Sequence, residues 1–578
     1  MKWIGCIALA FGLMGLTTCS VGSQANAFKE RREALQTRTL NARSYADFLR
    51  ARYASLTNDP EQAALYYAGA VRSNPYDHDL LERAVFSSLI AGRMEVAVAI
   101  SQNAKDITLA QTSLPRLILG IEALKADQPR KAERILLPET SSLFNDAISR
   151  NLIAWSLVAS NKHKEALAIL DATDNRDGLL QGLSQSTRAL IQLNSGDEAA
   201  ALETFEKMWQ ANNRLATSTE YHARLLAKSG ESDKALRLLR HFSNRVGQNA
   251  AIEALRSDIK AGEQITLTPP SLLEGAALSV YMPAAALASQ TRSDLAGVYF
   301  SLALSLDPNL DIARTLWGNS LDQADRREDA IATLQGVPKT SVFYATAQGQ
   351  IAWALRREDR NEDALKTARE ALAYAEDRNL KIQLGDLFRS LEQLEQAERV
   401  FSEIIAEDAK DSVEDWRLFY ARGAAREQLD RWPEAEADLL RAKDMAPNQP
   451  ALLNYLGYSW IDRGVRLDEG FELIKNAVAL RPNAGFIIDS YGWAFYKRGN
   501  FSEAVKHLER AVELEPNDPT LNDHLGDAYW RVGRKLEAGF QWNRTIRLDP
   551  DAENIPHLRA KIEDGLDRAN AHKTAKQN

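Results

Sequence analysis

Small residues recur along the chain at a nearly constant interval, and large apolar residues keep a fixed distance from them. Successive members of the series lie 33 to 38 residues apart, except for one step of 61 residues between Ala235 and Ala296. Internal periods of this length are typical of repeat proteins built from one helical unit. The series predicts fourteen units, whose markers are Ala63, Ala97, Ala132, Ala166, Ala201, Ala235, Ala296, Ala330, Ala364, Ala397, Ala435, Gly470, Ala504 and Ala538.

Each predicted unit carries two further markers at fixed offsets from its small residue. A second small residue usually lies twelve positions earlier, as Gly492 does before Ala504, and a large apolar residue lies four positions later, as Leu508 does. Two helices can cross closely only where both present small side chains, and a residue one turn away lies on the same face. The spacing therefore predicts a pair of antiparallel helices in every unit.

Residues that end helices lie between and after the predicted pairs. Gly499 and Gly533 each follow a first helix, and glycine accepts the left-handed conformation in which many helices end. Pro482 and Pro516 each follow a second helix, and proline cannot continue a helix. The predicted unit is therefore a helix, a turn, a second helix and a stop.

Three segments resemble the tetratricopeptide repeat family: Leu456-Gly457-Tyr458-Ser459-Trp460, Tyr491-Gly492-Trp493-Ala494-Phe495 and Leu525-Gly526-Asp527-Ala528-Tyr529. The resemblance is clearest from about residue 410 to 550, and the repeat is degenerate but in phase from 44 to 240. It implies an all-α, right-handed superhelical solenoid of about 14 antiparallel helix pairs. It also implies that the first helix of each pair lines a concave groove that holds partner proteins.

One stretch breaks the period and divides the predicted solenoid. Residues 241–283 contain Thr266-Leu267-Thr268-Pro269-Pro270, a segment that a helix cannot cross. We therefore expect a joint at 241–283 between an N-terminal arm over 28–240 and a C-terminal arm over 284–550. Residues 551–578 are expected to form a capping helix and a tail.

The first 27 residues have the pattern of an export signal. Lys2 is followed by 26 residues without a charge, and Ala25-Asn26-Ala27 fits a cleavage site for signal peptidase. Alternatively, Leu16-Thr17-Thr18-Cys19 resembles a lipobox, in which Cys19 is lipidated and becomes the mature N-terminus. Both alternatives predict an exported, periplasmic or envelope-associated protein, whose membrane contact is limited to a lipid anchor.

Charge and chemistry exclude several classes of function. The 578-residue chain has a formal net charge of -8 and a pI near 5.7, whereas nucleic-acid binders need a basic surface. Its two cysteines, Cys6 and Cys19, precede the repeats, so the repeats contain no disulfide and no thiolate metal site. The sequence shows no histidine pair with metal-ligand spacing, no phosphate-binding loop and no nucleophile elbow. We therefore expect no enzyme, no cofactor and no metal site.

A row of polar and aromatic residues on the first helices of the last three repeats is the predicted partner site. The positions three before, one after and four after the small residue share one face, turned away from the helix crossing. We name this row the first-helix stripe. It consists of Asn454, Tyr458, Asp489, Trp493, Asp523, Asp527 and Trp530.

Carboxylates beside tryptophans suit an extended segment that carries Lys or Arg, because the rings add apolar area and cation–π contact. The alternative is that Trp493 and Trp530 stack between neighbouring repeats and that the aspartates only solvate the groove. Family members that grip a free C-terminal carboxylate use Lys, Asn and Arg at groove positions. This chain has Asp, Ser and Trp there, so we do not expect a carboxylate ligand.

The sequence thus predicts a non-catalytic scaffold or adaptor of the cell envelope, which holds other proteins or extended peptide segments, including basic ones, in its groove. The alternative function is a lipoprotein subunit of a secretion, pilus or outer-membrane assembly machine. In that case Cys19 is acylated. No motif indicates the partner itself.

Overall fold

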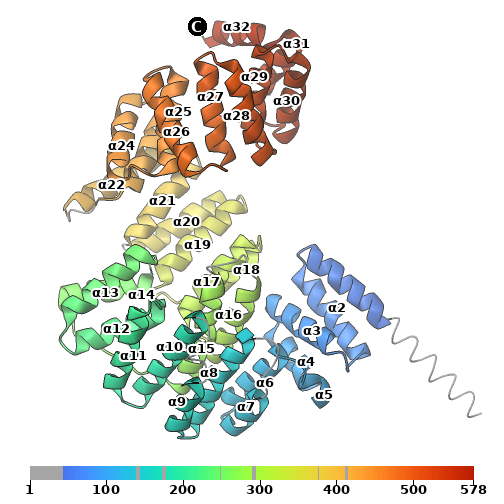
Figure 1. Ribbon diagram of the computed structural model, residues 1–578, viewed down its shortest axis with the longest axis vertical. Coiled ribbons are helices and arrows are strands. Elements are labelled where there is room, and N and C mark those ends of the chain that lie inside the picture. Colours follow the sequence, from blue (N-terminus) through green and yellow to red (C-terminus); the bar gives the residue numbers. More distant parts are fainter. Residues whose placement is uncertain are drawn as a thin grey trace, which may run out of the picture. The chain divides into compact units, whose positions relative to one another are not determined.

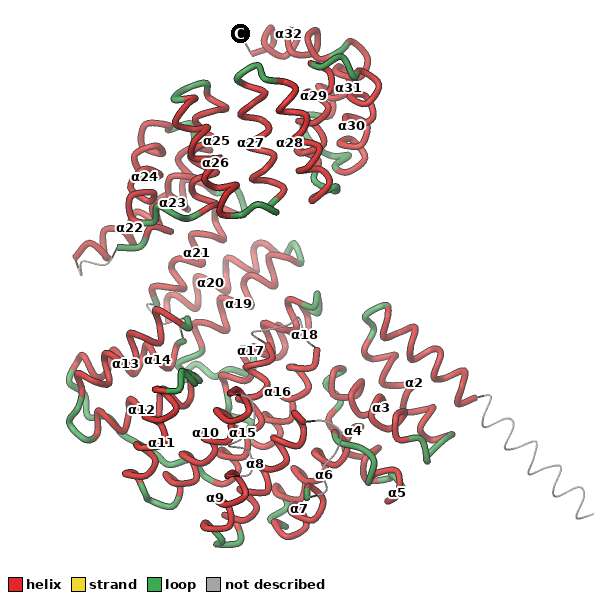
Figure 2. Tube along the Cα trace, viewed as in Figure 1, coloured by secondary structure: helices red, strands yellow, loops and turns green. Residues whose placement is uncertain are grey.

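The computed structural model describes seven stretches of the chain, and within them it contains helices and no strands (Figures 1 and 2). The predicted export signal and Cys19 lie outside the described residues. All the predicted helix pairs are present, so the all-α repeat fold is confirmed. The described stretches are 43–137, 143–171, 178–247, 249–288, 294–374, 377–410 and 414–577.

The chain divides into two compact units between Thr367 and Ala368, within helix α20. The first unit begins with a helix over residues 43–56. Its further helices are α2 (Pro60–Ser73), α3 (His78–Ile90), α4 (Met94–Gln102), α5 (Asp106–Leu109), α6 (Leu114–Lys125), α7 (Pro129–Leu136), α8 (Leu143–Ala159), α9 (His163–Asp171), α10 (Gly178–Asn194), α11 (Glu198–Gln210), α12 (Ala216–Lys228), α13 (Ser232–Arg245), α14 (Ala250–Ala261), α15 (Leu272–Ala288), α16 (Asp294–Leu306), α17 (Asp311–Gln323), α18 (Arg327–Leu334), α19 (Tyr344–Arg357) and the start of α20 (Asn361–Tyr374).

The second unit continues the same repeat, and each of its helix pairs packs beside the next (Figure 1, yellow to red). Its helices after α20 are α21 (Arg378–Ser390), α22 (Leu394–Lys410), α23 (Trp416–Gln428), α24 (Trp432–Met445), α25 (Pro450–Arg463), α26 (Leu467–Leu480), α27 (Gly485–Lys497), α28 (Phe501–Leu514), α29 (Pro519–Arg531), α30 (Lys535–Leu548), α31 (Ile555–Asp564) and α32 (Leu566–Gln577).

The turn inside each pair follows one rule throughout the described chain. The residue seven positions after the small residue of the first helix has a positive φ, which ends that helix in a left-handed conformation. Glycine, asparagine and aspartate adopt this conformation most readily, and they fill all these positions except one. The turn residues are Asn58, Gly92, Asp127, Asn161, Gly196, Gly230, Asp325, Asp359, Glu392, Asp430, Gly464, Gly499 and Gly533.

Small residues at the crossing point let the two helices of a pair approach closely, as the spacing predicts. A Cβ atom built on Gly492 would lie 2.7 Å from Leu508 Cγ, and one built on Gly526 would lie 2.5 Å from Trp542 Nε1. Leu508 is fully buried, and Trp542 is 1% exposed. A larger residue at either glycine would force the helices apart and open a void in this close-packed contact.

In the first unit, α15 packs across the first helices of two earlier repeats, α8 and α10. Ten consecutive residues, Gly275–Ala284, are buried, which explains why this helix is apolar on all sides. Helix α16, which follows it, packs against α3 and α6. Contacts between distant repeats therefore hold this unit together, in addition to those between neighbouring repeats.

The N-terminal repeats also meet the turn between α17 and α18. Asn58 donates a hydrogen bond from Nδ2 to the carbonyl oxygen of Ala324 at 3.2 Å. The Arg326 guanidinium donates to the carbonyl oxygen of Ile90. Both acceptors lie at helix ends, where carbonyl groups lack partners within their own helix.

Residues 241–283, where the sequence predicts a joint, lie within the first unit. They contain the end of α13, then α14, an extended segment over 263–271 without helix, and the first residues of α15. Pro269 and Pro270 lie in the extended segment, which agrees with the inability of a helix to cross them.

The second unit ends in two short helices, α31 and α32, which cover the last repeat. Leu558 and Leu566 are fully buried and belong to one hydrophobic cluster with Leu525, Tyr529 and Trp542. Helix α31 lies where the sequence predicts the capping helix. The apolar face of α30 would otherwise be exposed, as at the open end of any solenoid.

Candidate partner-binding site

The first-helix stripe lies on three consecutive first helices of the second unit, α25, α27 and α29. Helix α27 contacts both of the others. The structure therefore brings the stripe residues together as neighbouring rows, as the repeat spacing predicts. Their surroundings differ from one helix to the next, because several of them already have partners within the chain.

On α29, the stripe carboxylates bind a lysine of the capping helix. Lys561 Nζ lies 2.8 Å from an oxygen of Asp523 and 2.8 Å from an oxygen of Asp527, and Lys561 is 3% exposed. Trp542 Nε1 also donates to Asp527 at 2.9 Å. Two carboxylates therefore share one buried ammonium group. This part of the stripe is occupied by the chain itself.

Burial and electrostatics shift the pKa values in this cluster. Burial raises the pKa of Asp527 to about 6, because Lys561 offsets the cost of the buried charge only in part and Asp523 repels it. Burial would lower the pKa of Lys561, but Asp527 and Asp523 raise it above its ordinary value. The two shifts thus have different causes, burial for Asp527 and the two carboxylates for Lys561.

Trp530 is also held by the capping helices. A Cβ atom built on Gly565 would lie 2.4 Å from Trp530 Cζ2, so the ring lies directly against this glycine. Trp530 Nε1 donates to Asp567 of α32 at 3.3 Å. Its ring centroid lies 5.7 Å from that of Trp542. Trp530 therefore contributes to the packing of the C-terminal end.

On α27, Asp489 and Trp493 both contact a histidine of the next repeat. Asp489 Oδ2 lies 2.9 Å from His524 Nδ1, and Asp489 is 4% exposed. Burial alone would lower the pKa of His524, but the Asp489 carboxylate raises it above its ordinary value. The Trp493 ring stacks on His524 at 4.1 Å and on Tyr496 at 4.5 Å between ring centroids.

Three buried polar atoms on α25 and α27 have no hydrogen-bond partner in the described structure: Asn454 Oδ1, Asp489 Oδ1 and Trp493 Nε1. Buried polar atoms are normally paired, because leaving one unpaired costs about 1–3 kcal/mol. Tyr458 lies beside them, and burial together with Asp462 and Asp489 raises the pKa of its hydroxyl. Two acceptors and one donor on this part of the stripe are thus buried without a hydrogen-bond partner.

Sequence reasoning missed two residues that pair with the stripe, His524 and Lys561. The signal for Lys561 is present in the repeat period. Ala560 lies 34 positions after Gly526, so α31 continues the series of first helices and places Lys561 at the position held by Asp527 in α29. The repeat period alone could therefore have predicted that Lys561 lies next to Asp523 and Asp527.

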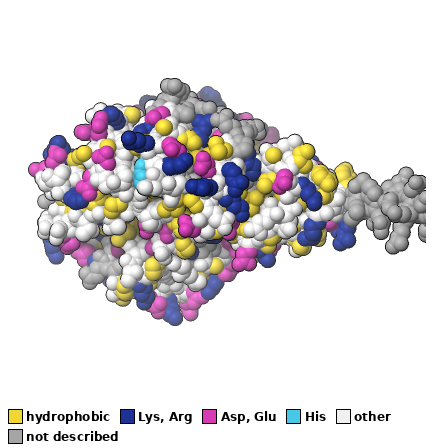
Figure 3. Space-filling view, turned by 90° about the horizontal axis from the view of Figure 1, so that it is seen from below, with side chains coloured by type: hydrophobic (Ala, Val, Ile, Leu, Met, Phe, Trp, Pro, Cys, Tyr) yellow, Lys and Arg dark blue, Asp and Glu magenta, His cyan; other side chains and the backbone are white. Residues whose placement is uncertain are grey.

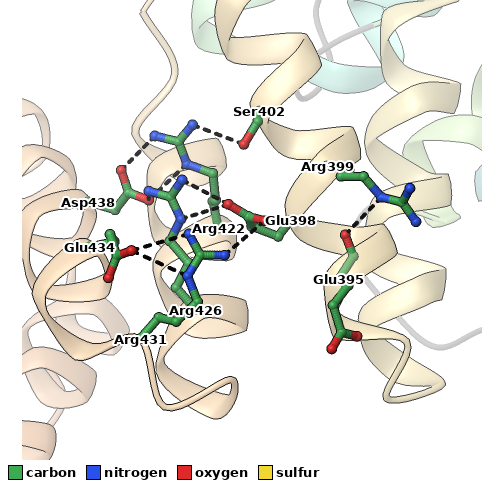
Figure 4. Close-up of polar contacts among 9 residues, drawn as sticks. All are labelled: Glu395, Glu398, Arg399, Ser402, Arg422, Arg426, Arg431, Glu434 and Asp438. Atoms are coloured by element: carbon green, nitrogen blue, oxygen red, sulfur yellow. Dashed lines mark hydrogen bonds and ion pairs between the residues drawn. The ribbon is translucent and has the colours of Figure 1, made fainter.

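A separate cluster of charges links α22, α23 and α24 (Figure 4). Arg422 makes two hydrogen bonds to Asp438, at 2.8 and 2.7 Å, and Arg426 binds both Asp438 and Glu398 at 2.8 Å. These four side chains are 7 to 16% exposed. Bidentate pairs of this kind are the strongest type of ion pair. They hold three helices in register and leave no charge in the cluster unbalanced.

A further surface is exposed at the start of the first unit. On the helix over 43–56, Tyr45, Leu49, Tyr53 and Leu56 are 65%, 48%, 69% and 79% exposed. Their spacing places them on one helical face. Hydrophobic side chains spread over this end of the unit in Figure 3. The sequence shows this spacing. It does not show that the four side chains are exposed, because an apolar stripe of this kind usually faces a core.

Two kinds of feature are absent from the described residues. No group of three or more His, Cys, Asp or Glu side chains has an arrangement that suits a metal ion. None of the described helices is both long enough and apolar enough to cross a bilayer.

Comparison with known families identifies the repeat directly in the second unit. Residues 492–533 match a model described as TPR repeat, and residues 382–450 match one described as tetratricopeptide repeat. A stretch of 104 residues is 36% identical to the TPR repeat-containing protein PA4667 of Pseudomonas aeruginosa, covering 18% of each chain. This chain therefore matches less than a fifth of that relative's length.

Three solved structures with a similar trace cover different shares of this chain. The Cut9–Hcn1 complex of the APC/C matches with 16% identity and a TM-score of 0.39, covering 85% of this chain and 96% of that one. Yeast Tom70 matches with 14% identity and a TM-score of 0.35, covering 80% and 96%. A tetratricopeptide repeat protein from Parabacteroides merdae matches with 15% identity and a TM-score of 0.37, covering 43% and 96%.

The repeat period, the paired helices and the matched segments agree with one another. Tetratricopeptide repeats generally bind other proteins or peptides and serve as interaction scaffolds. The chain is therefore a tetratricopeptide repeat protein.

Proposed function

We propose that this protein is a non-catalytic adaptor of the cell envelope, which holds partner proteins on the first helices of its second unit. The observation that carries the proposal is the pair of half-buried aromatic residues on α25 and α27, Tyr458 and Trp493, beside the buried unpaired atoms Asn454 Oδ1, Asp489 Oδ1 and Trp493 Nε1. The two rings provide apolar area. Aromatic residues next to unpaired polar groups are typical of binding hot spots.

The first unit does not offer the same surface, because α15 covers the first helices α8 and α10. The far end of the stripe, on α29, is held by Lys561 and the capping helices. The proposed partner surface is therefore the middle of the second unit. A basic segment remains a suitable partner there, since the half-buried Tyr458 ring can attract a cation.

Location in the envelope rests on the export pattern of residues 1–27. The second candidate function is a lipoprotein subunit of a secretion, pilus or outer-membrane assembly machine, which the lipobox-like Leu16-Thr17-Thr18-Cys19 favours. Mass spectrometry of the N-terminal peptide distinguishes the two. An acylated N-terminal Cys19 supports the second function, whereas a chain beginning at Phe28 supports the soluble adaptor.

Site-specific photocrosslinking in cells tests the adaptor function. A photoreactive amino acid replaces Tyr458 on α25 or, as the control, Leu536 on α30, which is 79% exposed and outside the stripe. We expect discrete crosslinked partner bands from position 458 that are absent from position 536. Equal patterns from the two positions, or no band from position 458, would contradict the proposal.

A further inference from the structure

The first and last repeats of the described chain differ in how their outer faces are covered. At the C-terminal end, α31 and α32 bury Leu558 and Leu566 against the last repeat. At the N-terminal end, the helix over residues 43–56 has an outer face that is exposed to solvent. Terminal repeats normally have a polar outer face, which keeps the protein soluble. The outer face of this helix departs from that rule.

Large apolar side chains form a row along the outer face of the helix over 43–56. They recur at intervals of three or four residues, so they share one side of the helix. We name this row the N-terminal apolar face, and its members are Tyr45, Leu49, Tyr53 and Leu56, which are 48% to 79% exposed. The inner side packs on α2 through the buried small residues Ala51 and Ala54. The packing of the repeat therefore uses the inner side and does not require the apolar row.

Basic side chains flank the N-terminal apolar face on both sides. With about 3.6 residues per turn, Arg52 lies on one side of the row, and Arg43 and Arg50 lie on the other. All three arginines are exposed. The single acidic residue of this helix, Asp47, belongs to the inner side.

Two contacts place Asp47 away from the row. An added Cβ on Gly69 of α2 would lie 2.8 Å from Asp47 Oδ2, so the carboxylate lies directly against that helix. Its side chain is 13% exposed and pairs with Arg50 at 3.7 Å. The outer face is therefore apolar in the middle and basic at both edges, although the whole chain has a net charge of -8.

We infer that the N-terminal apolar face docks this protein on an anionic lipid surface. A helix that lies in the interface of a bilayer buries leucine and aromatic side chains below the headgroups, while its basic residues attract anionic lipids. Tyrosine suits this depth, because its ring is apolar and its hydroxyl can stay hydrated. A second copy of the chain fits less well, because a symmetric contact would bring the arginines at the edges of one row against those of the other.

The position of this helix in the chain agrees with a membrane contact. The segment between Cys19 and Arg43 has 23 residues. A chain acylated at Cys19 would therefore keep the helix within about 80 Å of the bilayer. In a chain that begins at Phe28, the apolar face itself would provide the contact. The inference goes beyond the proposed function, because it concerns the first unit and applies to both forms of the N-terminus.

Vesicle binding tests the inference with the chain that begins at Phe28, which lacks both the export signal and Cys19. Co-sedimentation compares vesicles of phosphatidylcholine with vesicles that also contain phosphatidylglycerol, an anionic lipid. We expect binding to the anionic vesicles and binding at least about tenfold weaker to the neutral ones. Each arginine near an anionic surface contributes about fivefold in affinity.

A double variant tests the apolar row. Leu49→Ser with Tyr53→Ser changes only exposed side chains, and it should weaken binding to the anionic vesicles about tenfold or more. The matched control is Leu536→Ser with Phe540→Ser on α30, two side chains that are also four residues apart and are 79% and 70% exposed. The control should bind as tightly as the unaltered chain. Circular dichroism confirms that each variant is folded.

A second double variant tests the basic edges. Arg43→Gln with Arg52→Gln should weaken binding to the anionic vesicles about tenfold and leave binding to neutral vesicles unchanged. Arg237→Gln with Arg240→Gln on α13 removes the same number of exposed charges from another helix. It should change binding by less than about twofold, since those arginines lie outside the proposed contact.

A fluorescent label locates the contact. The chain that begins at Phe28 contains no cysteine, so Leu49→Cys can carry an environment-sensitive dye at one site. We expect its emission to shift to shorter wavelength on anionic vesicles, whereas the same dye on Leu536→Cys should show no shift.

Several results would overturn the inference. They are no binding to anionic vesicles, equal binding to neutral and anionic vesicles, equal binding by the Leu49→Ser, Tyr53→Ser variant and the unaltered chain, and no shift at position 49. Analytical ultracentrifugation provides another test, because a dimer that this variant dissociates would identify a second copy as the occupant. Crosslinking from position 458 tests the adaptor function separately, so failure of one proposal is distinguishable from failure of the other.

Discussion

Asp523, Asp527 and Lys561 form a cluster in which two carboxylates meet one buried ammonium group. Removing both charges of a buried pair is often tolerated, but removing one leaves the other without compensation. The cluster also joins α31 to α29, so a change of its charges should alter the stability of the capping helices α31 and α32. Its behaviour can therefore be tested one residue at a time.

We expect Lys561→Met to destabilise the capping helices by about 3 kcal/mol, because it leaves the buried Asp527 and the partly exposed Asp523 without a cation. Hydrogen exchange of the amides of α31 and α32 measures this change. Lys506→Met is the control, because that side chain is 72% exposed and its pair with Glu503 lies on the surface. The control should change stability by less than about 0.5 kcal/mol. Equal exchange in both variants would contradict a structural role for Lys561.

We expect Asp527→Asn to alter the pH dependence of the cap. The pKa of Asp527 is raised from 3.8 to about 6 in the folded protein, so the folded state binds this proton more tightly than the unfolded state does. The stability that the proton contributes is present below pH 4 and is lost as the pH rises through about 6. Relative to Asp527→Asn, the unaltered protein should therefore gain stability between pH 7 and pH 4.5.

Melting followed by tryptophan fluorescence at several pH values measures this difference. Asp527→Asn should cost little at pH 7, because Asp523 still binds Lys561 and the cluster becomes neutral. A loss at pH 7 as large as that of Lys561→Met would contradict this account.

At the scale of single residues, the sequence predicted the first-helix stripe but not the side chains of the chain that pair with it. The repeat period places Asp489 and Asp523 on one face, because helical geometry fixes which residues share a side. Whether a carboxylate on that face meets solvent or a cation depends on the next repeat. His524 and Lys561 are the side chains that pair with these carboxylates, and their long-range pairing is not visible in local spacing.

Among single elements, α15 is the helix whose surroundings differ most from those of an ordinary repeat helix. It is the first helix of its own pair with α16, and it also packs on α8 and α10. The sequence predicts a helix over this segment, and its apolar residues on all sides indicate burial. Composition cannot tell which distant helices bury it.

We expect Gly275→Val to destabilise the first unit by about 2 kcal/mol. The added side chain overlaps the Trp155 ring, and overpacking a close contact costs about 1–3 kcal/mol. Chemical denaturation followed by near-ultraviolet circular dichroism reports on the tryptophan environment.

Gly539→Ala on α30 is the matched control, because an added Cβ there meets no atom within 4 Å. Alanine favours a helix over glycine by up to about 1 kcal/mol, so this variant should be slightly more stable. A denaturation curve for Gly275→Val that coincides with that of the unaltered protein would show that α15 can shift freely.

At the scale of the whole chain, the two units use the same repeat differently. The second unit is an array in which each helix pair packs on its neighbours, whereas the first unit also joins its early and late repeats. The sequence predicts the repeat over both, because every helix pair has the same local signals. The contacts between distant repeats leave no periodic signal in the sequence, so the sequence did not predict them.

We expect Arg326→Ala to loosen the contact between the N-terminal repeats and the turn that precedes α18. The variant removes a charged donor from the Ile90 carbonyl, and hydrogen bonds of this kind contribute about 1.5–3 kcal/mol. Hydrogen exchange at residues 57–59 and 90–93 should rise. Arg327→Ala is the control, since Arg327 pairs with Glu358 of the adjacent repeat. Exchange that rises equally in both variants would contradict this role of Arg326.

The packing of α15 has a consequence for the order in which the chain folds. An array of repeats can begin folding anywhere and spread to its neighbours, because each contact joins residues that are close in sequence. Trp155 and Ser279 are 124 positions apart, Asn145 and Tyr299 are 154 apart, and Ile90 and Arg326 are 236 apart. Forming such contacts closes long loops, which slows folding. The early repeats of the first unit therefore reach their final packing only after α15 and α16 have been synthesised, whereas the second unit can fold one helix pair at a time.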